Sequence, residues 1–197
     1  EIYGGITYGL SGETAPSIAE IPEMRDRCVI LDGFSKLHAM TGWRIGYAVI
    51  PESFILGIQA VTSLHTIRLN TISQYAALAA YRGPQDVIAN MVAADKRRMT
   101  ILVDGINAID GLRCQFPDAT YYGWVNSSDL GVSAEDLAKH CFASERVMFS
   151  AGTNHAGGGG KNHHRVSSSL PEEIILEGLD RLGRAVERLK KEGPILE

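Results

Sequence analysis

The sequence lacks any long apolar run, and it carries little excess charge of either sign. No segment approaches the roughly 18 apolar residues that a membrane-spanning helix needs, so we expect no membrane partner. The 19 basic and 23 acidic residues give a formal net charge of -4, which offers no general electrostatic reason to bind nucleic acid. The 197 residues are 45% hydrophobic and 21% charged, as in an ordinary globular protein of one domain or slightly more.

Cysteine is also scarce. Cys28, Cys114 and Cys141 are odd in number, widely spaced and outside any metal-binding pair. This pattern favours reduced thiols that are buried as small hydrophobic side chains, and hence a cytoplasmic location. The chain starts without Met and without a targeting signal, and we expect further sequence upstream.

The first half of the sequence predicts two short strands and three helices. Residues 28–31 and 44–50 are brief apolar runs that end at turn residues, as in buried strands. Helical spacing of apolar residues follows over 51–65, with an Ala-rich helix over 73–81. Residues 84–109 keep one apolar stripe throughout, which predicts a single long helix.

The second half mixes strands with helices. Ser133 with Asp136, and Ser169 with Glu172, have the spacing of capping pairs at the start of a helix. The strand candidates are residues 112–116, 120–125, 146–149 and 164–168. This order predicts an α/β lobe followed by a smaller α+β lobe, divided near the long helix.

One segment, residues 33–47, contains residues suited to a phosphorylated aldehyde. A lysine attacks an aldehyde as the uncharged amine, and burial of Lys36 at the mouth of an apolar sheet favours that form. The Arg44 guanidinium is able to hold a phosphate through two parallel hydrogen bonds. Together they suit pyridoxal phosphate. On these residues alone, a solvated lysine and a surface-paired arginine are the commoner interpretation.

The same segment resembles the cofactor-lysine motif of the class I/II pyridoxal-phosphate aminotransferases of fold type I. That motif reads Ser-x-Ser-Lys, a short spacer, and Met-Thr-Gly-Trp-Arg-x-Gly-Tyr. The sequence here has Gly33-Phe34-Ser35-Lys36 and then Met40-Thr41-Gly42-Trp43-Arg44-Ile45-Gly46-Tyr47.

The resemblance covers nearly the whole chain, as the C-terminal half of the family's fold. It implies an α/β protein that contains part of the large-domain sheet and a small C-terminal α+β domain. Residues 1–84 would belong to the large pyridoxal-phosphate-binding domain, 85–110 would form the interdomain helix, and 111–197 the small domain.

The resemblance also implies roles for individual residues. Lys36 would be the catalytic lysine that forms the Schiff base with the cofactor. Arg44 and Ser35 would bind the cofactor phosphate, and Tyr3, in Glu1-Ile2-Tyr3, would donate a hydrogen bond to the cofactor's phenolic oxygen. In the family, a Gly-containing loop precedes a strand whose arginine pairs with the substrate α-carboxylate, and Arg165 stands there. From the residues alone, an Arg165 bound to a neighbouring acid is as good an interpretation.

The sequence departs from the family pattern in three places. Gly33 stands where many members have a phosphate-binding serine, and residues 154–163 form a Gly-rich segment that we expect to be a mobile loop. We expect its histidines, His155, His163 and His164, to be solvated, with no metal site. The aspartate that pairs with the pyridine nitrogen, and the aromatic residue that stacks on the ring, would precede Glu1 in the missing N-terminal half.

Other polar and aromatic residues have plainer interpretations. We expect His38 to pack, Arg68 to form a surface ion pair, and Tyr121 and Tyr122 to pack in a sheet.

The resemblance therefore implies an aminotransferase that moves an amino group between an amino acid and a 2-oxo acid, and that acts as a homodimer. Two alternatives stay open. One is a pyridoxal-phosphate-dependent lyase or synthase of the same fold. The other is the sensor domain of an aminotransferase-like transcription regulator.

Overall fold

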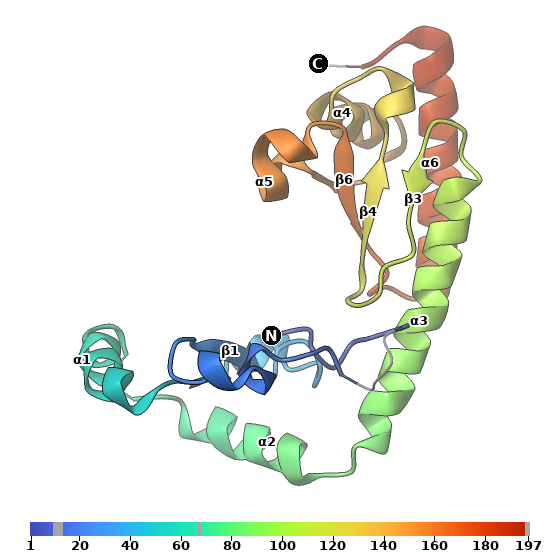
Figure 1. The fold of residues 1–197 in the computed structure, drawn as a ribbon. Helices are drawn as coiled ribbons and strands as arrows, with labels where there is room; N and C mark the ends of the chain where they lie inside the picture. The colour runs from blue at the N-terminus through green and yellow to red at the C-terminus, as the bar shows by residue number, and fades with distance from the viewer. Residues whose placement is uncertain (10–13, 67, 196–197) are drawn as a thin grey trace. The chain divides into compact units, whose positions relative to one another are not determined.

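The computed structural model describes residues 1–9, 14–66 and 68–195. The chain divides into two compact units. The N-terminal unit comprises residues 1–92 with 118–120, and the C-terminal unit comprises residues 93–117 and those from 121 onward. The division falls within the long helix α3 (Asp86–Asn107; Figure 1). The boundaries near 84 and 110 that the sequence suggested stay a prediction.

The N-terminal unit is built on a two-stranded antiparallel sheet. Strands β1 (Ile30–Gly33) and β2 (Gly46–Val49) pair so that Gly33 lies opposite Gly46. Helices α1 (Ile55–His65) and α2 (Thr71–Arg82) follow. Short 3-10 turns occupy Ile18–Glu20, Pro22–Met24, Thr41–Trp43 and Glu52–Phe54.

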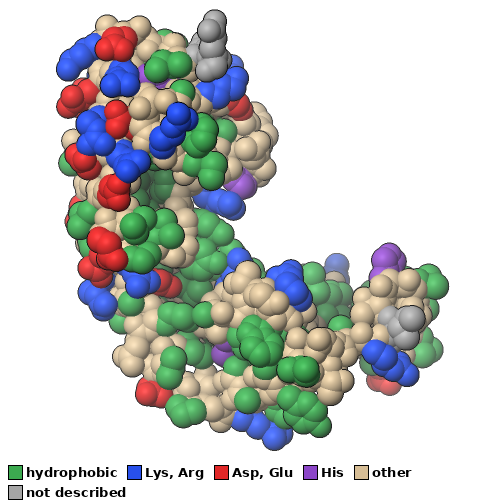
Figure 2. All heavy atoms as spheres, turned by 180° about the vertical axis from the view of Figure 1, so that it is seen from behind, with side chains coloured by type: hydrophobic (Ala, Val, Ile, Leu, Met, Phe, Trp, Pro, Cys, Tyr) green, Lys and Arg blue, Asp and Glu red, His purple; other side chains and the backbone are tan. Residues whose placement is uncertain are grey.

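The prediction that the two strands are buried is wrong for the described residues. Leu31 is 64% exposed and Val49 is 55% exposed. The reason is that this sheet has only two strands, and β2 is exposed along its whole length. Hydrophobic side chains also lie at the surface of α1 and α2, as the space-filling view illustrates for one face (Figure 2).

The C-terminal unit contains a four-stranded antiparallel sheet in the order β3-β4-β6-β5. Its strands are β3 (Arg113–Cys114), β4 (Tyr122–Asn126), β5 (Ser150–Ala151) and β6 (His163–Ser167). Its helices are α4 (Ala134–Glu145), α5 (Thr153–Ala156) and α6 (Glu172–Glu192; Figure 1). A buried core forms between the sheet and the helices, with Met99, Ile106, Leu112, Leu137 and Val186 each at most 2% exposed.

Cys141, on α4, is part of this core. It is completely buried, and burial raises the pKa of its thiol to about 12. The sequence-based expectation of a small buried hydrophobic residue is therefore confirmed at this position.

Of the two capping pairs predicted at helix starts, one is present in the structure and the other is not. The Ser133 hydroxyl accepts a hydrogen bond from the Asp136 backbone N–H at 3.1 Å, which caps α4 as predicted. The predicted pair of Ser169 and Glu172 is wrong, because Pro171 precedes α6 without a side-chain cap. The Ser169 hydroxyl instead lies 2.7 Å from the hydroxyl of Ser167.

The predicted strand over 146–149 is also wrong. Arg146 has the left-handed conformation, with φ of 57°, and its N–H donates to the Phe142 carbonyl to end α4. Strand β5 begins only at Ser150, where pairing with β6 becomes possible.

The Gly-rich segment contains a closed turn, and the mobility that we expected of it stays a prediction. Gly157–Gly160 form a 3-10 turn, and Gly160 is buried against Gly152. A Cβ atom at Gly160 would lie 2.1 Å from the Gly152 carbonyl carbon. The Gly152 N–H also donates to the His163 carbonyl at 2.7 Å, which joins the turn to β6.

Among the residues that the structure describes, no helix is both long enough and apolar enough to cross a membrane.

Candidate functional site

The loop between β1 and β2 contains three of the predicted cofactor residues. The strand pairing ends at Gly33 and Gly46, and the Phe34 N–H donates to the Ile45 carbonyl at 3.3 Å. Lys36 follows the end of β1 and Arg44 precedes β2. Lys36 and Arg44 therefore lie at the same end of the hairpin, in the loop that connects its two strands.

Thr41 holds the two sides of this loop together. Its hydroxyl donates to the Ser35 carbonyl at 2.9 Å, and its own carbonyl accepts a hydrogen bond from Arg44 Nη1 at 2.8 Å. Arg44 has φ of 52°, and this left-handed backbone turns the chain into β2. The loop thus brings the segments of Ser35 and Arg44 together.

Tyr3 lies beside Lys36. The Lys36 Nζ atom is 5.7 Å from the centre of the Tyr3 ring, within reach of a cation–π contact, and both residues are half-buried. Residues from the start of the chain and from the hairpin loop therefore meet at the lysine.

A cavity of about 420 Å³ opens beside the loop in the N-terminal unit, and neither Lys36 nor Arg44 lines it. In its wall, the Tyr47 hydroxyl donates to Asp32 at 3.0 Å. Burial raises the pKa of Tyr47, and the Asp32 carboxylate raises it further.

His38 packs, as expected. Its ring centre lies 4.9 Å from that of Phe34, and its buried Nδ1 has no hydrogen-bond partner among the described residues. Burial lowers the pKa of His38, against the opposing effect of Asp32.

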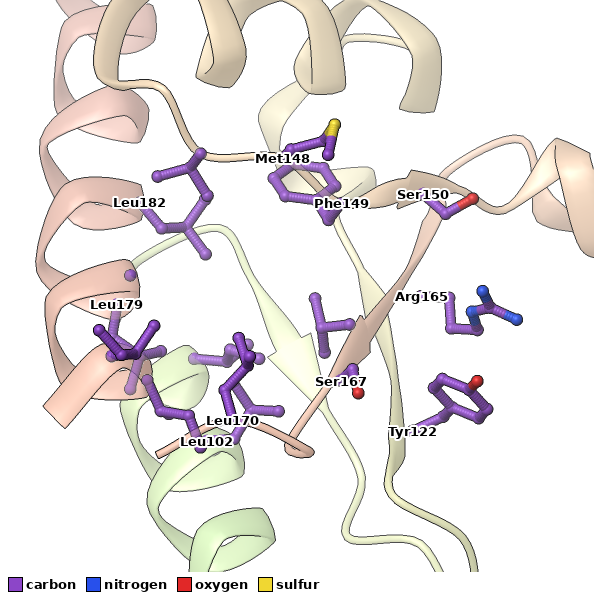
Figure 3. A pocket seen from close by; sticks show the side chains of 16 residues that line it. Leu102, Tyr122, Met148, Phe149, Ser150, Arg165, Ser167, Leu170, Leu179 and Leu182 are labelled. Carbon is purple, nitrogen blue, oxygen red and sulfur yellow. The ribbon is translucent and has the colours of Figure 1, made fainter. Parts of the chain in front are cut away.

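The fifth predicted residue, Arg165, lies in the C-terminal unit. It is the middle residue of β6, opposite Trp124 of β4 and Ser150 of β5. Its guanidinium carbon lies 4.3 Å from the centre of the Tyr122 ring. Figure 3 shows the two side chains together, on the side of the strands away from the leucines of α3 and α6.

Arg165 makes no ion pair within the part of the chain that the structure describes. By contrast, Arg184 on α6 pairs with Glu145 at 2.9 Å. The interpretation in which a neighbouring acid holds Arg165 is therefore not observed, and its N–H groups remain available to an anion.

A cavity of about 260 Å³ lies next to Arg165. Most of its wall is apolar, from α3, α6 and the segment before β5. Arg165 and Tyr122 also line it, but Figure 3 shows the guanidinium and the ring turned to the other side of the strands. The C-terminal unit thus has an apolar cavity on one face of the sheet and an arginine without an ion pair among the described residues on the other.

The expectation of solvated histidines is wrong for His164. It is 2% exposed, and burial lowers its pKa to about 4. Its Nε2 lies 3.0 Å from the Ser127 hydroxyl, and its ring meets Phe149 edge-on. No group of three or more potential metal ligands occurs among the described residues.

Sequence reasoning missed Tyr122, which we expected only to pack. Alternation along a strand places Tyr122 and Trp124 on one face, but the pairing of β4 with β6 decides that Arg165 shares that face. The alternation of side chains along β4 can be read from the sequence. The residues of β6 that lie opposite them cannot.

Comparisons with known proteins find relatives of one family over most of the chain. Residues 1–182 match the family model described as aminotransferase class I and II. Aspartate aminotransferases from Geobacillus stearothermophilus and Bacillus subtilis are 34% and 31% identical, each over 95% of this chain and 48% of the relative. The chain spans about half the length of the curated relatives it matches.

Two solved structures have a similar mixed α/β fold. The aromatic aminotransferase from Pyrococcus horikoshii OT3 has a TM-score of 0.90 and 25% identity, over 96% of this chain and 50% of that one. The aspartate aminotransferase from Rhizobium meliloti has a TM-score of 0.87 and 29% identity, over 95% of this chain and 48% of that one.

Proposed function

Because the chain belongs to the class I and II aminotransferases, a pyridoxal-phosphate-dependent family, we propose that the whole protein moves an amino group between an amino acid and a 2-oxo acid. The observation that carries this proposal is the β1–β2 loop. It joins the segments of Lys36, Ser35 and Arg44 through Thr41, and it places Tyr3 next to the lysine.

The residues of this loop fit pyridoxal phosphate. Lys36 supplies an amine beside an aromatic ring. Arg44 is exposed, and of its guanidinium nitrogens Nη1 donates a hydrogen bond to the Thr41 carbonyl. At the base of the loop, a Cβ atom on Gly33 would lie 3.0 Å from the Gly46 Cα atom. The serine common in the family would therefore be crowded here, which leaves Ser35 and Arg44 as the proposed phosphate ligands.

When bound, pyridoxal phosphate would supply an electron sink for charge that develops at the substrate α-carbon. Lys36 would bond to the cofactor aldehyde at rest. Once an amino acid has taken its place, the freed Nζ would remove the α-proton as a general base and then, as an acid, donate it to C4′, the carbon that carried the cofactor aldehyde. Arg44 and Ser35 would hold the phosphate, and Tyr3 would donate a hydrogen bond to the phenolic oxygen.

Arg165 would bind the substrate α-carboxylate. Its planar guanidinium matches the two oxygens of a carboxylate, and no acidic side chain among the described residues competes for it. Holding the carboxylate would restrict how the bound amino acid can turn, and would thereby fix the direction of its α C–H bond.

The choice of substrate and the assembly are parts of the same proposal. Aspartate is the first amino donor to test, because relatives about a third identical are named aspartate aminotransferases. Exposed apolar residues such as Leu56 and Leu64 on α1 support a homodimer and contact with an N-terminal half. Three free cysteines, two of them buried, support a cytoplasmic location.

The test of the reaction uses the whole protein with aspartate and a 2-oxo acid acceptor. We expect one molecule of new amino acid for each molecule of new 2-oxo acid. Release of ammonia without transfer to the acceptor would contradict the proposal and favour a lyase.

The test of the site replaces Lys36 in the whole protein. Lys36→Ala should abolish covalent attachment of the cofactor at this position and lower the rate of transfer by several powers of ten, because the variant lacks the amine there. Borohydride reduction followed by peptide mass spectrometry measures the attachment. Lys161→Ala removes an exposed lysine of the other unit and serves as the control. Normal transfer by the Lys36 variant would rule out this assignment.

A further inference from the structure

The Arg165 guanidinium lies over the face of an aromatic ring from the neighbouring strand. The two groups belong to β6 and β4, and the guanidinium carbon is 4.3 Å from the Tyr122 ring centre. Arg165 and Tyr122 are not directly opposite in the register, because Tyr122 pairs with Ser167 and Arg165 pairs with Trp124. The arginine side chain therefore leans diagonally across the sheet to reach the ring (Figure 3).

This contact restrains the guanidinium without using its donors. A free arginine side chain samples many rotamers, and part of that freedom is lost when it binds a ligand. A ring beneath the guanidinium removes some of that freedom in advance, while the N–H groups stay in the plane and point outward. An ion pair with an acid would also fix the side chain, but it would consume the donors that a carboxylate needs.

We propose that Tyr122 is a positioning residue that holds the Arg165 guanidinium flat, so that its N–H groups present a preformed fork to the substrate α-carboxylate. The inference rests on the proposed function, in which Arg165 binds that carboxylate. It goes further because it assigns part of the affinity for substrate to a residue that does not touch the substrate.

The neighbouring aromatic and polar side chains are engaged elsewhere. The Trp124 ring stacks on His163, with ring centres 5.6 Å apart and planes 12° apart. The Ser150 hydroxyl lies 2.9 Å from His155 Nε2. Among the described residues, Tyr122 is thus the one whose ring meets the Arg165 guanidinium.

The first experiment compares Tyr122→Leu with Tyr122→Phe in the whole protein loaded with cofactor. The leucine variant should raise KM for the amino acid about 3- to 30-fold, the range that a cation–π contact supplies, with little change in kcat. The phenylalanine variant keeps the ring face and should rescue most of the lost affinity. An equal rise in KM for both variants would overturn the inference, because the hydroxyl and not the ring would then matter.

A second series avoids the loss of packing that leucine brings. Phenylalanine analogues with increasing fluorination at position 122 keep the shape of the ring and progressively weaken its negative face. We expect KM for the amino acid to rise stepwise along the series. The rate with an amine that lacks a carboxylate should not follow the series, and a KM independent of fluorination would refute the proposal.

Arg165→Lys separates this inference from the proposed function. If Arg165 binds the α-carboxylate, the lysine variant loses affinity for the amino acid and no longer responds to fluorination at position 122. If Arg165→Lys leaves KM unchanged, the proposed role of Arg165 fails. If Arg165→Lys raises KM but the Tyr122 variants do not, only the positioning role fails.

Discussion

His164 and Arg165 are adjacent on β6, and the sheet gives them opposite environments. The Arg165 side chain lies on one face of the sheet and makes no ion pair among the described residues, whereas His164 is buried on the other face. The His164 Nε2 reaches the Ser127 hydroxyl, while its Nδ1 has no partner within the described part of the chain. The neutral ring fits this site, and a charged ring would be costly there.

We predict that His164 makes the C-terminal unit less stable in acid. Its pKa is about 4 in the folded protein, and the ordinary value is 6.5. Between these values the unfolded chain binds a proton that the folded chain does not, so stability falls as the pH drops from 6.5 to 4. The full loss is about 3 kcal/mol.

The measurement is an NMR titration of the histidine ring signals, combined with thermal unfolding of the whole protein and of its His164→Asn variant. The His164 signals should not titrate above pH 5, and the variant should lose this component of the acid sensitivity. A His164 that titrates near pH 6.5 in the folded protein would contradict the prediction.

At the scale of elements, the β1–β2 loop depends on a few short contacts around Thr41. We predict that Thr41→Val weakens binding of pyridoxal phosphate to the whole protein about 3- to 10-fold, because it removes the hydrogen bond to the Ser35 carbonyl. Equilibrium dialysis measures the affinity. Thr100→Val removes a similar bond, to the Lys96 carbonyl inside α3, and should leave the affinity unchanged. Equal losses for both variants would show that the loop contact has no special role.

The closed glycine turn gives a second prediction at this scale. Gly160→Ala should destabilise the C-terminal unit by roughly 1–3 kcal/mol, because the new Cβ would overlap the Gly152 backbone and force it to move. Gly158→Ala is the matched control, since no atom lies within 4 Å of its Cβ position. Thermal unfolding of both variants tests this, and equal midpoints would argue against the closure.

Sequence patterns predicted these elements unevenly. Helices α3 and α6 were found because a long apolar stripe at helical spacing is unambiguous. The hairpin loop was found because a long motif spans it. The end of α4 at Arg146 was missed, because nothing in the sequence marks a left-handed residue that is not glycine. The contact of Tyr122 with Arg165 was missed because it depends on register.

At the scale of the whole molecule, α1 has an apolar surface that a solvent-exposed helix would not keep. Leu56 is 80% exposed and Leu64 is 84% exposed in this chain. Apolar surface of this kind marks contact with another protein surface. We predict that Leu64→Asp in the whole protein lowers the thermal midpoint or dissociates the assembly, as size-exclusion chromatography would detect.

The control for this change is Gln59→Asp, which adds the same charge to an exposed polar position of α1. It should leave both the midpoint and the assembly unaltered. A Leu64 variant that behaves like the Gln59 variant would mean that α1 faces water in the whole protein.

The burial of Cys141 makes it a natural reporter of structural opening. The thiolate is the form that reacts with alkylating reagents, and a thiol whose pKa is about 12 supplies almost none of it at neutral pH. Covalent labelling at this position therefore requires α4 to separate from the core. The rate of labelling, followed by mass spectrometry, would measure how often the C-terminal unit opens under native conditions, without any engineered probe.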